Sequence, residues 1–356
     1  MMLLKLFANC ILLKGATRAV ICDLQRSNYH LIPMSLFDLF DEDMLKLNFN
    51  IYNKQQKSIL YEYVEFLTAN ELAFTISQNE LELFPKLSLE WDYPSKITNI
   101  IIDIKHGKID LSNIISQIED LRCYYLQFRF FRPVQMDEII SIGNLLFDSL
   151  IHGFEALIPN ADTVDEVALT NIVNLFPKLK NLIVYNHPEE KEVCITSDNV
   201  GGVFFINSNI SSAMHCGVIH PAYFAINIET FTESQHHNSC LNRKISIDVD
   251  GEIKNCPSLA KSYGNIKDTK LIDVVNNPEF QKVWHIKKDE ITKCKDCEFR
   301  HICTDCRAYL ENPEDRYSAP LKCGYNPYTC EWEEWSSNPL KKQAIEHYGM
   351  QELINL

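Results

Sequence analysis

The feature that most constrains this chain is a dense group of cysteines near its C-terminal end. Eight of the thirteen cysteines lie between Cys240 and Cys330. The stretch opens with Cys240, ten residues, Gly251, four residues and Cys256, and two CxxC pairs follow further on. A CxxC turn lets two thiolates converge on one soft metal centre, and a second pair closes the site. The spacing therefore predicts a metal-binding module.

A hairpin is predicted in the first half of this module. Asp250-Gly251 is a common signal for a tight two-residue turn, and it separates the strand-like stretches 245–249 and 252–254. Pairing of these stretches would bring Cys240 and Cys256 together. The other cysteines of the module are Cys294, Cys297, Cys303, Cys306, Cys323 and Cys330.

Composition limits the partners of such a protein. The chain has 356 residues, of which 46% are hydrophobic and 23% charged, as in a globular protein of two or three domains. A formal net charge of −14 argues against nucleic acid or an anionic membrane as the main partner. No stretch of the sequence approaches the run of about eighteen apolar residues that would span a bilayer.

The start of the chain bears on the redox compartment. Residues 1–13 include a short apolar run, but Lys14 and Arg18 follow it without a convincing cleavage site, so it is interpreted as a strand. Without a secretory signal we expect a cytoplasmic protein whose thiols stay reduced. Metal ligation is therefore favoured over a disulfide framework, and by spacing alone the metal could be zinc or iron.

The stretch from Cys240 to Cys323 resembles the SPASM domain, the auxiliary iron–sulfur module found after the barrel of many radical-SAM peptide-modifying enzymes. That family's pattern is C-x(9–15)-G-x4-C, then C-x2-C-x5-C-x3-C and a final cysteine. Here the last spacing, Cys303 to Cys306, is one residue short. The resemblance implies one or two [4Fe–4S] clusters, with zinc as the alternative.

The resemblance also implies which cysteines act together. One set is Cys294, Cys297, Cys303 and either Cys323 or Cys330, and the other is Cys240, Cys256 and Cys306. A fourth ligand of the second set often lies just upstream of the first cysteine, where this chain has Ser234. His236, His237 and the more distant Cys216 are the candidates for that place, unless the cluster has three protein ligands or is absent.

The first 77 residues are predicted to be strands followed by helices. Strands are expected at 7–13, 18–23 and 28–32, a short helix capped by Ser35 and containing Leu36, Phe37 and Phe40, and a longer helix at 54–72. This order is similar to the PqqD-like winged helix, which binds leader peptides between its third strand and last helix. Such binding is strand addition, in which unpaired backbone groups supply affinity.

From Ile97 onward, strand-like and helix-like stretches alternate. Strands are expected at 97–104, 124–130, 154–158, 181–185, 203–206 and 224–228, and helices at 111–121, 136–149 and 164–176. Strands at such intervals indicate a parallel sheet, either a partial (β/α) barrel or an open sheet. Beside a SPASM module, the fold implied is the barrel of the radical-SAM superfamily.

One motif of that superfamily is missing. Its enzymes carry CxxxCxxC after the first barrel strand, because three thiolates leave one iron open to S-adenosylmethionine. Here the corresponding loop is Lys105-His-Gly-Lys108, and the motif occurs nowhere in the sequence. Cys123, Cys194 and Cys216 are too scattered to replace it. We therefore expect a degenerate barrel without an S-adenosylmethionine site.

Nearly end to end, the chain resembles the SPASM-domain peptide maturases encoded with an ATP-grasp ligase, the grasp-with-spasm systems. The resemblance is carried by residues 231–243, 303–309 and 322–335. It implies an accessory protein that binds the leader of a ribosomally made precursor peptide and works with an ATP-grasp ligase. Two alternatives are an enzyme that uses an auxiliary iron–sulfur cluster on a bound peptide, and a zinc-stapled binding protein. No catalytic residue is assigned.

The expected α/β organisation has five parts. These are a PqqD-like domain at 1–77, a linker at 78–96, a degenerate barrel at 97–235, a SPASM domain at 236–335 and a C-terminal segment at 336–356 with a helix from Lys341 to Leu356.

Overall fold

The computed structural model describes residues 2–47, 49–107, 109–161, 164–194 and 201–354. The chain divides into two compact units, each made of segments that are far apart in the sequence. Unit 1 takes residues 1–92, 218–239 and 285–356, and unit 2 takes residues 93–217 and 240–284. Helices and a largely parallel eight-stranded sheet confirm the predicted α/β class.

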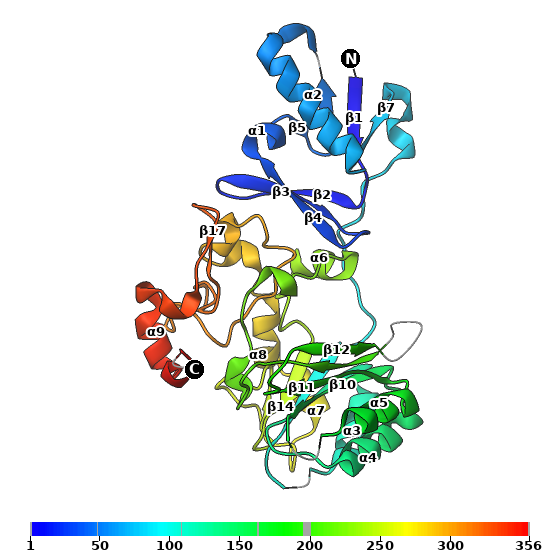
Figure 1. Ribbon diagram of the computed structural model, residues 1–356, viewed down its shortest axis with the longest axis vertical. Coiled ribbons are helices and arrows are strands. Elements are labelled where there is room, and N and C mark those ends of the chain that lie inside the picture. The colour runs from blue at the N-terminus through cyan, green and yellow to red at the C-terminus, as the bar shows by residue number, and fades with distance from the viewer. Residues whose placement is uncertain (1, 48, 108, 162–163, 195–200, 355–356) are drawn as a thin grey trace. The chain divides into compact units, whose positions relative to one another are not determined.

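An eight-stranded sheet forms the centre of unit 2 (Figure 1), in the order β12-β13-β11-β10-β9-β8-β14-β15. The six central strands pair in parallel, and the outer strands β12 and β15 pair antiparallel. The strands are β8 (Asn99–Ile104), β9 (Tyr125–Phe130), β10 (Gly153–Pro159), β11 (Leu179–Tyr185), β12 (Lys191–Cys194), β13 (Gly202–Phe205), β14 (Lys244–Ile247) and β15 (Ile253–Lys254). Among the described residues the sheet is open, with β12 and β15 at its edges.

Three amphipathic helices connect the parallel strands: α3 (Leu111–Asp120), α4 (Met136–Phe147) and α5 (Glu166–Leu175). Figure 1 shows them side by side along the sheet. Asp110 and Asp165 begin α3 and α5 by accepting hydrogen bonds from backbone N–H groups in the first turn. The buried helix residues pack against alternate strand residues such as Ile102 and Phe128, and each such buried side chain contributes about 1.5–3 kcal/mol.

The sheet face opposite these helices is polar. Side chains alternate between the two faces of a strand, so Asp103 and Arg129 point away from the buried Ile102 and Phe128. Arg129 donates two hydrogen bonds to the Asp103 carboxylate, at 2.7 and 2.8 Å. On the same face, Glu155 accepts hydrogen bonds from Gln127 and Asn181 on the neighbouring strands.

The first half of the cysteine-rich region extends this sheet. β14 pairs in parallel with β8, aligning Ile245 with Ile100. The predicted hairpin forms, but its loop has three residues rather than two. The backbone N–H of Asp248 donates to the carbonyl of Glu252 at 3.0 Å, and Gly251 takes a φ of +85°. Three-residue loops of this kind use glycine at the left-handed position.

Unit 1 opens with two antiparallel sheets. One has the order β2-β3-β4 and the other β5-β6-β1-β7. A single strand across residues 1–13 was the wrong prediction, because a turn closed by the Cys10 N–H and the Phe7 carbonyl at 2.8 Å divides it. The strands are β1 (Met2–Leu6), β2 (Cys10–Lys14), β3 (Arg18–Asp23), β4 (Asn28–Pro33), β5 (Phe40–Asp41), β6 (Met44–Leu47) and β7 (Ala73–Ile76).

Two helices accompany these sheets. α1 (Met34–Phe37) has Pro33 at its N-cap, so the predicted Ser35 cap is wrong, and the Ser35 hydroxyl instead lies 2.7 Å from the Tyr63 hydroxyl. Phe40 belongs to β5 rather than to that helix. α2 (Lys54–Ala69) begins with a capping box of Asn53 and Gln56 and ends three residues before the predicted Leu72.

The later segments of unit 1 are mostly turns and short helices. A strand at 224–228 was the wrong prediction, because the Asn227 side chain caps α6 (Ile228–Ser234) there. The predicted C-terminal helix is interrupted at Gly349, which has a φ of +65°. The other short elements in these later segments of unit 1 are η4 (Pro221–Tyr223), η6 (Lys288–Glu290), η7 (Cys294–Asp296), β16 (Tyr325–Asn326), β17 (Glu331–Trp332), η8 (Trp335–Ser337), η9 (Pro339–Lys341), α9 (Lys342–His347) and α10 (Gln351–Ile354).

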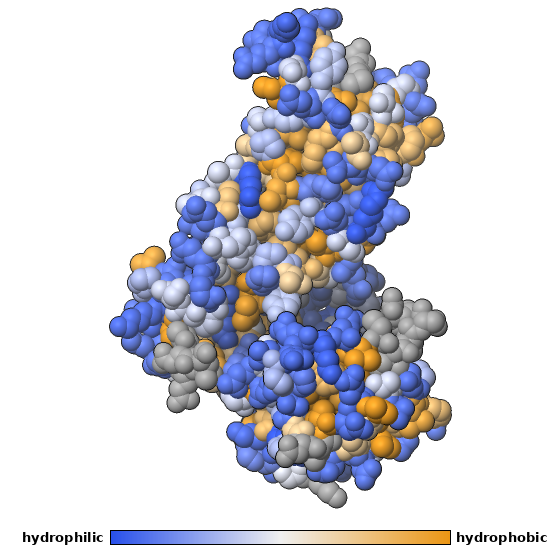
Figure 2. Space-filling model, in the orientation of Figure 1, coloured by the Kyte–Doolittle hydropathy of each residue, from blue (hydrophilic) through white to orange (hydrophobic). Residues whose placement is uncertain are grey.

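The remaining short helices are η1 (Phe49–Ile51), η2 (Gln78–Leu83), η3 (Ala213–His215), α7 (Leu271–Val275), α8 (Pro278–Gln281) and η5 (Lys282–His285). None of the helices in the described ranges combines the length and the hydropathy that a bilayer-spanning segment needs. On the face shown in Figure 2, hydrophobic residues lie in separate patches among hydrophilic ones.

Within unit 1 the N-terminal sheet β2-β3-β4 packs against the late cysteine-rich segment. Arg18 on β3 donates to the buried Glu298 carboxylate at 2.6 Å, although 280 positions separate them. The Ala16 N–H donates to the Asp296 carbonyl at 2.7 Å. The Tyr29 and Phe299 rings meet edge to face, with centroids 5.5 Å apart. The first strands of the chain therefore support the loop that carries the CxxC pairs.

Candidate metal centres

The first group of thiols lies in unit 1. Cys294 and Cys297 flank the turn of η7, where the Cys297 N–H donates to the Cys294 carbonyl at 3.0 Å. Cys303 follows another tight turn, its N–H donating to the Phe299 carbonyl at 2.9 Å. Cys323 joins a parallel bridge with Ile219. Cys294 and Cys303 are buried, and Cys297 and Cys323 are half-buried.

Electrostatics show that these four thiols are neighbours. Burial raises the pKa of Cys294 to about 12, and Cys323 and Cys303 are among the groups whose charges act on it. Burial likewise raises the pKa of Cys297, with Cys303 and Cys294 acting in the same direction. Without a metal Cys294, Cys297 and Cys303 are therefore protonated at neutral pH, and a thiolate-bound metal must displace those protons.

A buried lysine accompanies this group. The Lys288 ammonium lies 3.5 Å from the Cys303 sulfur and 3.7 Å from the Asp305 carboxylate. Burial disfavours its charge, but Cys303, Cys294 and Asp305 outweigh that effect and raise its pKa well above the ordinary value. Arg307 also pairs with Asp305, at 2.7 Å. A fixed positive charge beside thiolate ligands offsets the negative charge of a thiolate-bound cluster.

The second group of thiols lies in unit 2. The Lys244 ammonium donates to the Cys240 sulfur at 3.4 Å. Burial lowers the pKa of Lys244, but Cys240, Cys256 and Cys216 outweigh that effect, so that its net shift is upward. Burial raises the pKa of Cys256 to about 11, with Cys240 and Cys216 acting in the same direction. Lys244 thus contacts one thiol and interacts electrostatically with two more.

The other predicted ligands have different surroundings. Cys306 is buried and belongs to unit 1, whereas Cys240 and Cys256 belong to unit 2. Cys330 is half-buried, with a φ of +61°. The Ser234 hydroxyl donates to the Phe231 carbonyl at 2.7 Å and lies 3.2 Å from His301.

The two histidines beside Ser234 differ in exposure. His236 is exposed, and the His237 ring lies 5.4 Å from the rings of both Trp91 and His285. In the loop after β8, Lys108 lies outside the described residues, as does the side chain of Cys194.

Three cysteines that the metal prediction left out are buried in hydrophobic cores. Burial raises the pKa of each to about 12: Cys10, Cys22 and Cys123. Since the thiolate is the nucleophile, we expect these three to resist brief alkylation with iodoacetamide at neutral pH in the folded protein. The exposed Cys216 of the metal-free protein should react within the same time. Mass spectrometry of the labelled peptides measures this, and rapid labelling of Cys22 in the folded protein would contradict the buried position.

The donor sets fit an iron–sulfur cluster by their chemistry. Thiolates are the usual ligands of [4Fe–4S] clusters, one to each iron. Within the described residues, no three His, Cys, Asp or Glu side chains are arranged to enclose a single metal ion. What sequence reasoning missed was the pair of lysines, because nothing in the spacing of Lys244 and Lys288 marks them as neighbours of thiols.

A comparison with protein families identifies part of this region. Residues 239–298 match the family model of SPASM, an iron–sulfur cluster-binding domain. The match covers Cys240, Cys256, Cys294 and Cys297, and it confirms the predicted SPASM module over that range. No curated protein and no solved structure matches the chain.

Proposed function

We propose that this chain is an iron–sulfur accessory protein in the maturation of a ribosomally made peptide. In this role it binds the leader of the precursor and works with an ATP-grasp ligase that forms the new bonds. The observation that carries the proposal is the packing, within unit 1, of the N-terminal sheet against the thiol-bearing segment in which the SPASM match ends.

The cluster of unit 1 would be held by Cys294, Cys297, Cys303 and Cys323. Cys323 is preferred to Cys330 because its charge acts on both Cys294 and Cys303. When bound, a [4Fe–4S] cluster supplies electron transfer or an electrophilic iron. The residues of the chain bury it: Phe299, Ile302 and Tyr325 surround the thiols in one apolar cluster that also includes Leu13 and Val20 of the N-terminal sheet.

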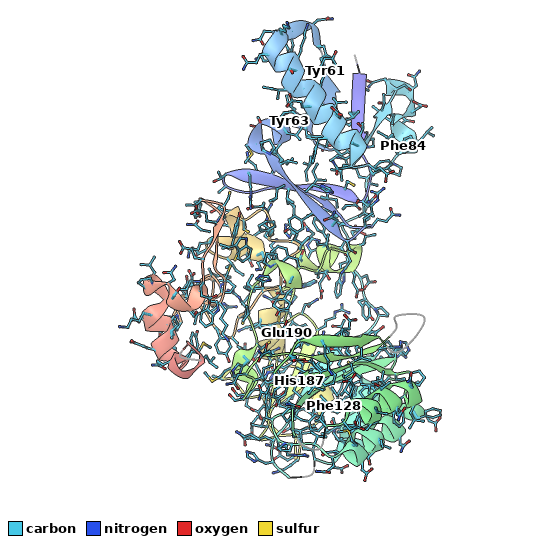
Figure 3. The ribbon with its side chains drawn as sticks, in the orientation of Figure 1. Tyr61, Tyr63, Phe84, Phe128, His187 and Glu190 are labelled. Atoms are coloured by element: carbon cyan, nitrogen blue, oxygen red, sulfur yellow. The ribbon has the colours of Figure 1, made fainter. Side chains whose placement is uncertain are left out.

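The leader would bind along β4, in the manner of a PqqD-like domain. In the described part of the chain β4 pairs with β3 alone, which makes it an edge strand open to strand addition. Leu31 on β4 is 42% exposed. α2 borders the strand, with the ring centroids of His30 and Phe66 6.0 Å apart, and Figure 3 shows Tyr61 and Tyr63 on this helix.

The proposed leader-binding strand and the proposed cluster-binding loop are in physical contact. Tyr29, beside His30 on β4, contacts Phe299, which lies between Cys297 and Cys303 in the sequence. Strand addition at β4 would therefore take place on an element that packs directly against the cluster-binding loop. A leader held there would keep the peptide close to the metal module of unit 1.

The test is a titration of the full-length protein with the fluorescently labelled leader of the neighbouring precursor peptide. We expect a Kd on the order of micromolar, and Leu31→Asp should raise it about tenfold, which is ~1.4 kcal/mol. The matched control is Leu340→Asp, because Leu340 is 91% exposed in unit 1 and lies on η9, away from β4 in the sequence. No binding by the unaltered protein would overturn leader recognition, and equal effects of the two substitutions would overturn its placement on β4.

A second candidate function, an enzyme acting through its own cluster, has one observation in its favour. In unit 2, Lys244 contacts Cys240 at 3.4 Å, and the charges of Cys256 and Cys216 act on both Lys244 and Arg129. Three thiolates leave one iron of a four-iron cluster without a cysteine ligand, and such an iron is open to a substrate.

A further inference from the structure

Cys216 is a cysteine whose role cannot be decided from its spacing in the sequence. It follows η3 (Ala213–His215), where its N–H donates to the Ala213 carbonyl at 3.1 Å. It is followed by Gly217, which has a φ of +88°. Cys216 thus sits between a tight helical turn and a glycine in the left-handed conformation, so the chain direction changes at this thiol.

A hydrogen bond joins this turn to the loop that carries Cys256. The Ser258 hydroxyl donates to the Ala213 carbonyl at 2.9 Å. The same loop is closed by the Leu259 N–H, which donates to the Cys256 carbonyl at 3.0 Å. Two segments that are about forty positions apart in the sequence are therefore held side by side, with one cysteine on each.

The hairpin register relates the third thiol, that of Cys240, to Cys256 through Lys244. β14 and β15 align Ser246 with Lys254, and continuing that register by two residues sets Lys244 opposite Cys256. Lys244 in turn donates to the sulfur of Cys240 at 3.4 Å. Lys244 therefore contacts Cys240 directly and lies across the hairpin from Cys256.

Positive charge at this place compensates thiolate charge. Lys244 supplies one positive charge, 3.4 Å from the Cys240 sulfur. Burial lowers the pKa of Arg129, while Asp103, Cys216 and Cys256 raise it, with a net upward shift. Three thiolates without a nearby cation would repel one another, and two cations reduce that repulsion.

We infer that Cys216, Cys240 and Cys256 together ligate an iron–sulfur cluster in unit 2, with Lys244 donating a hydrogen bond to the Cys240 ligand. Cys216 thereby acts as a cluster ligand contributed from outside the residues that match the SPASM family. The inference rests on the iron–sulfur part of the proposed function and is independent of leader binding.

The first test uses the unaltered protein, purified without oxygen and compared with its metal-free form. We expect iodoacetamide to alkylate Cys216 at least about tenfold more slowly in the loaded protein, because a metal-bound thiolate is not free to react. The half-buried Cys240 should be protected in parallel. Equal alkylation of Cys216 in the two forms, with iron and sulfide present in the loaded protein, would overturn the inference.

The second test compares Cys216→Ala with Cys123→Ala, a cysteine of the same unit buried in the hydrophobic core. Cys216→Ala should lose the same share of iron and acid-labile sulfide as Cys256→Ala and change the electron paramagnetic resonance signal of the reduced protein. Cys123→Ala should keep both. Full iron and an unchanged signal in Cys216→Ala would remove Cys216 from the ligand set. If the unaltered protein contains neither iron nor sulfide, both the inference and the cluster assignment are overturned. Leader binding is tested separately, by its own titration.

Discussion

Cys294→Ala is expected to abolish the cluster of unit 1. Protein purified without oxygen should contain about four irons and about four sulfides for each cluster, and this substitution should remove one cluster's complement. The reason is that Cys294 opens the CxxC turn and is buried among Cys297, Cys303 and Cys323, so the other thiols have no replacement for it. Colorimetric iron and sulfide assays per chain, with zinc measured alongside, provide the result.

The chain contains a matched control for this experiment. Cys330→Ala removes a half-buried cysteine seven positions after Cys323, and it should leave iron and sulfide unchanged, while Cys323→Ala should behave like Cys294→Ala. Iron lost from Cys330→Ala but kept in Cys323→Ala would reverse the proposed ligand assignment. One or two zinc ions without sulfide would instead show that the module is a zinc-bound structural element, a role for which spacing alone is sufficient.

Arg129→Met should lower the free energy of unfolding by about 3–5 kcal/mol. Arg129 and Asp103 form a doubly hydrogen-bonded pair on adjacent strands, with side chains only 8% and 1% exposed. Burial raises the pKa of Asp103 and the charge of Arg129 opposes that shift. Removal of the guanidinium leaves the buried Asp103 carboxylate without its counter-charge, and this unpaired buried charge is what lowers the free energy of unfolding. Urea denaturation of protein with equal metal content measures the change.

Arg132→Met is the control, since Arg132 also forms a doubly hydrogen-bonded pair, with Glu138. The side chains of Arg132 and Glu138 are 27% and 33% exposed. Exposed ion pairs contribute about 1 kcal/mol or less to stability. The double variant Asp103→Leu/Arg129→Met should recover much of the loss, because it buries no unpaired charge. If Arg129→Met and Arg132→Met cost the same, the burial of the Asp103–Arg129 pair would have no energetic importance.

Local order in the chain could largely be predicted. The helices α3, α4 and α5 and the strands from β8 to β11 occupy nearly the residues expected from the periodicity of apolar side chains. The failures were local as well. A side-chain cap at Asn227 outweighed strand propensity at 224–228, and Gly349 interrupted the terminal helix. Capping and positive-φ positions depend on single residues, which a pattern over ten or more positions does not register.

The resemblance implied two groups of thiols, but it did not relate Cys216 to either group by its spacing. The CxxC pairs and the SPASM pattern identified the thiols, and the absence of CxxxCxxC is a property of the sequence itself. That Cys216 lies beside the loop of Cys256 was not accessible in the same way. Cys216 lies outside the SPASM match and has no recognisable spacing to Cys240, and the lysines beside each group carry no motif.

The sequence by itself determined the kind of module and the kind of ligand, because CxxC turns and hairpins are formed by residues close together in the chain. Only the tertiary structure decided that Arg18 meets Glu298, that β14 completes the sheet begun by β8, and that Cys216 lies with Cys256. These relations join segments far apart in the sequence. They depend on how sheets bury their apolar faces and how buried charges find partners, and neither requirement leaves a periodic signal in the chain.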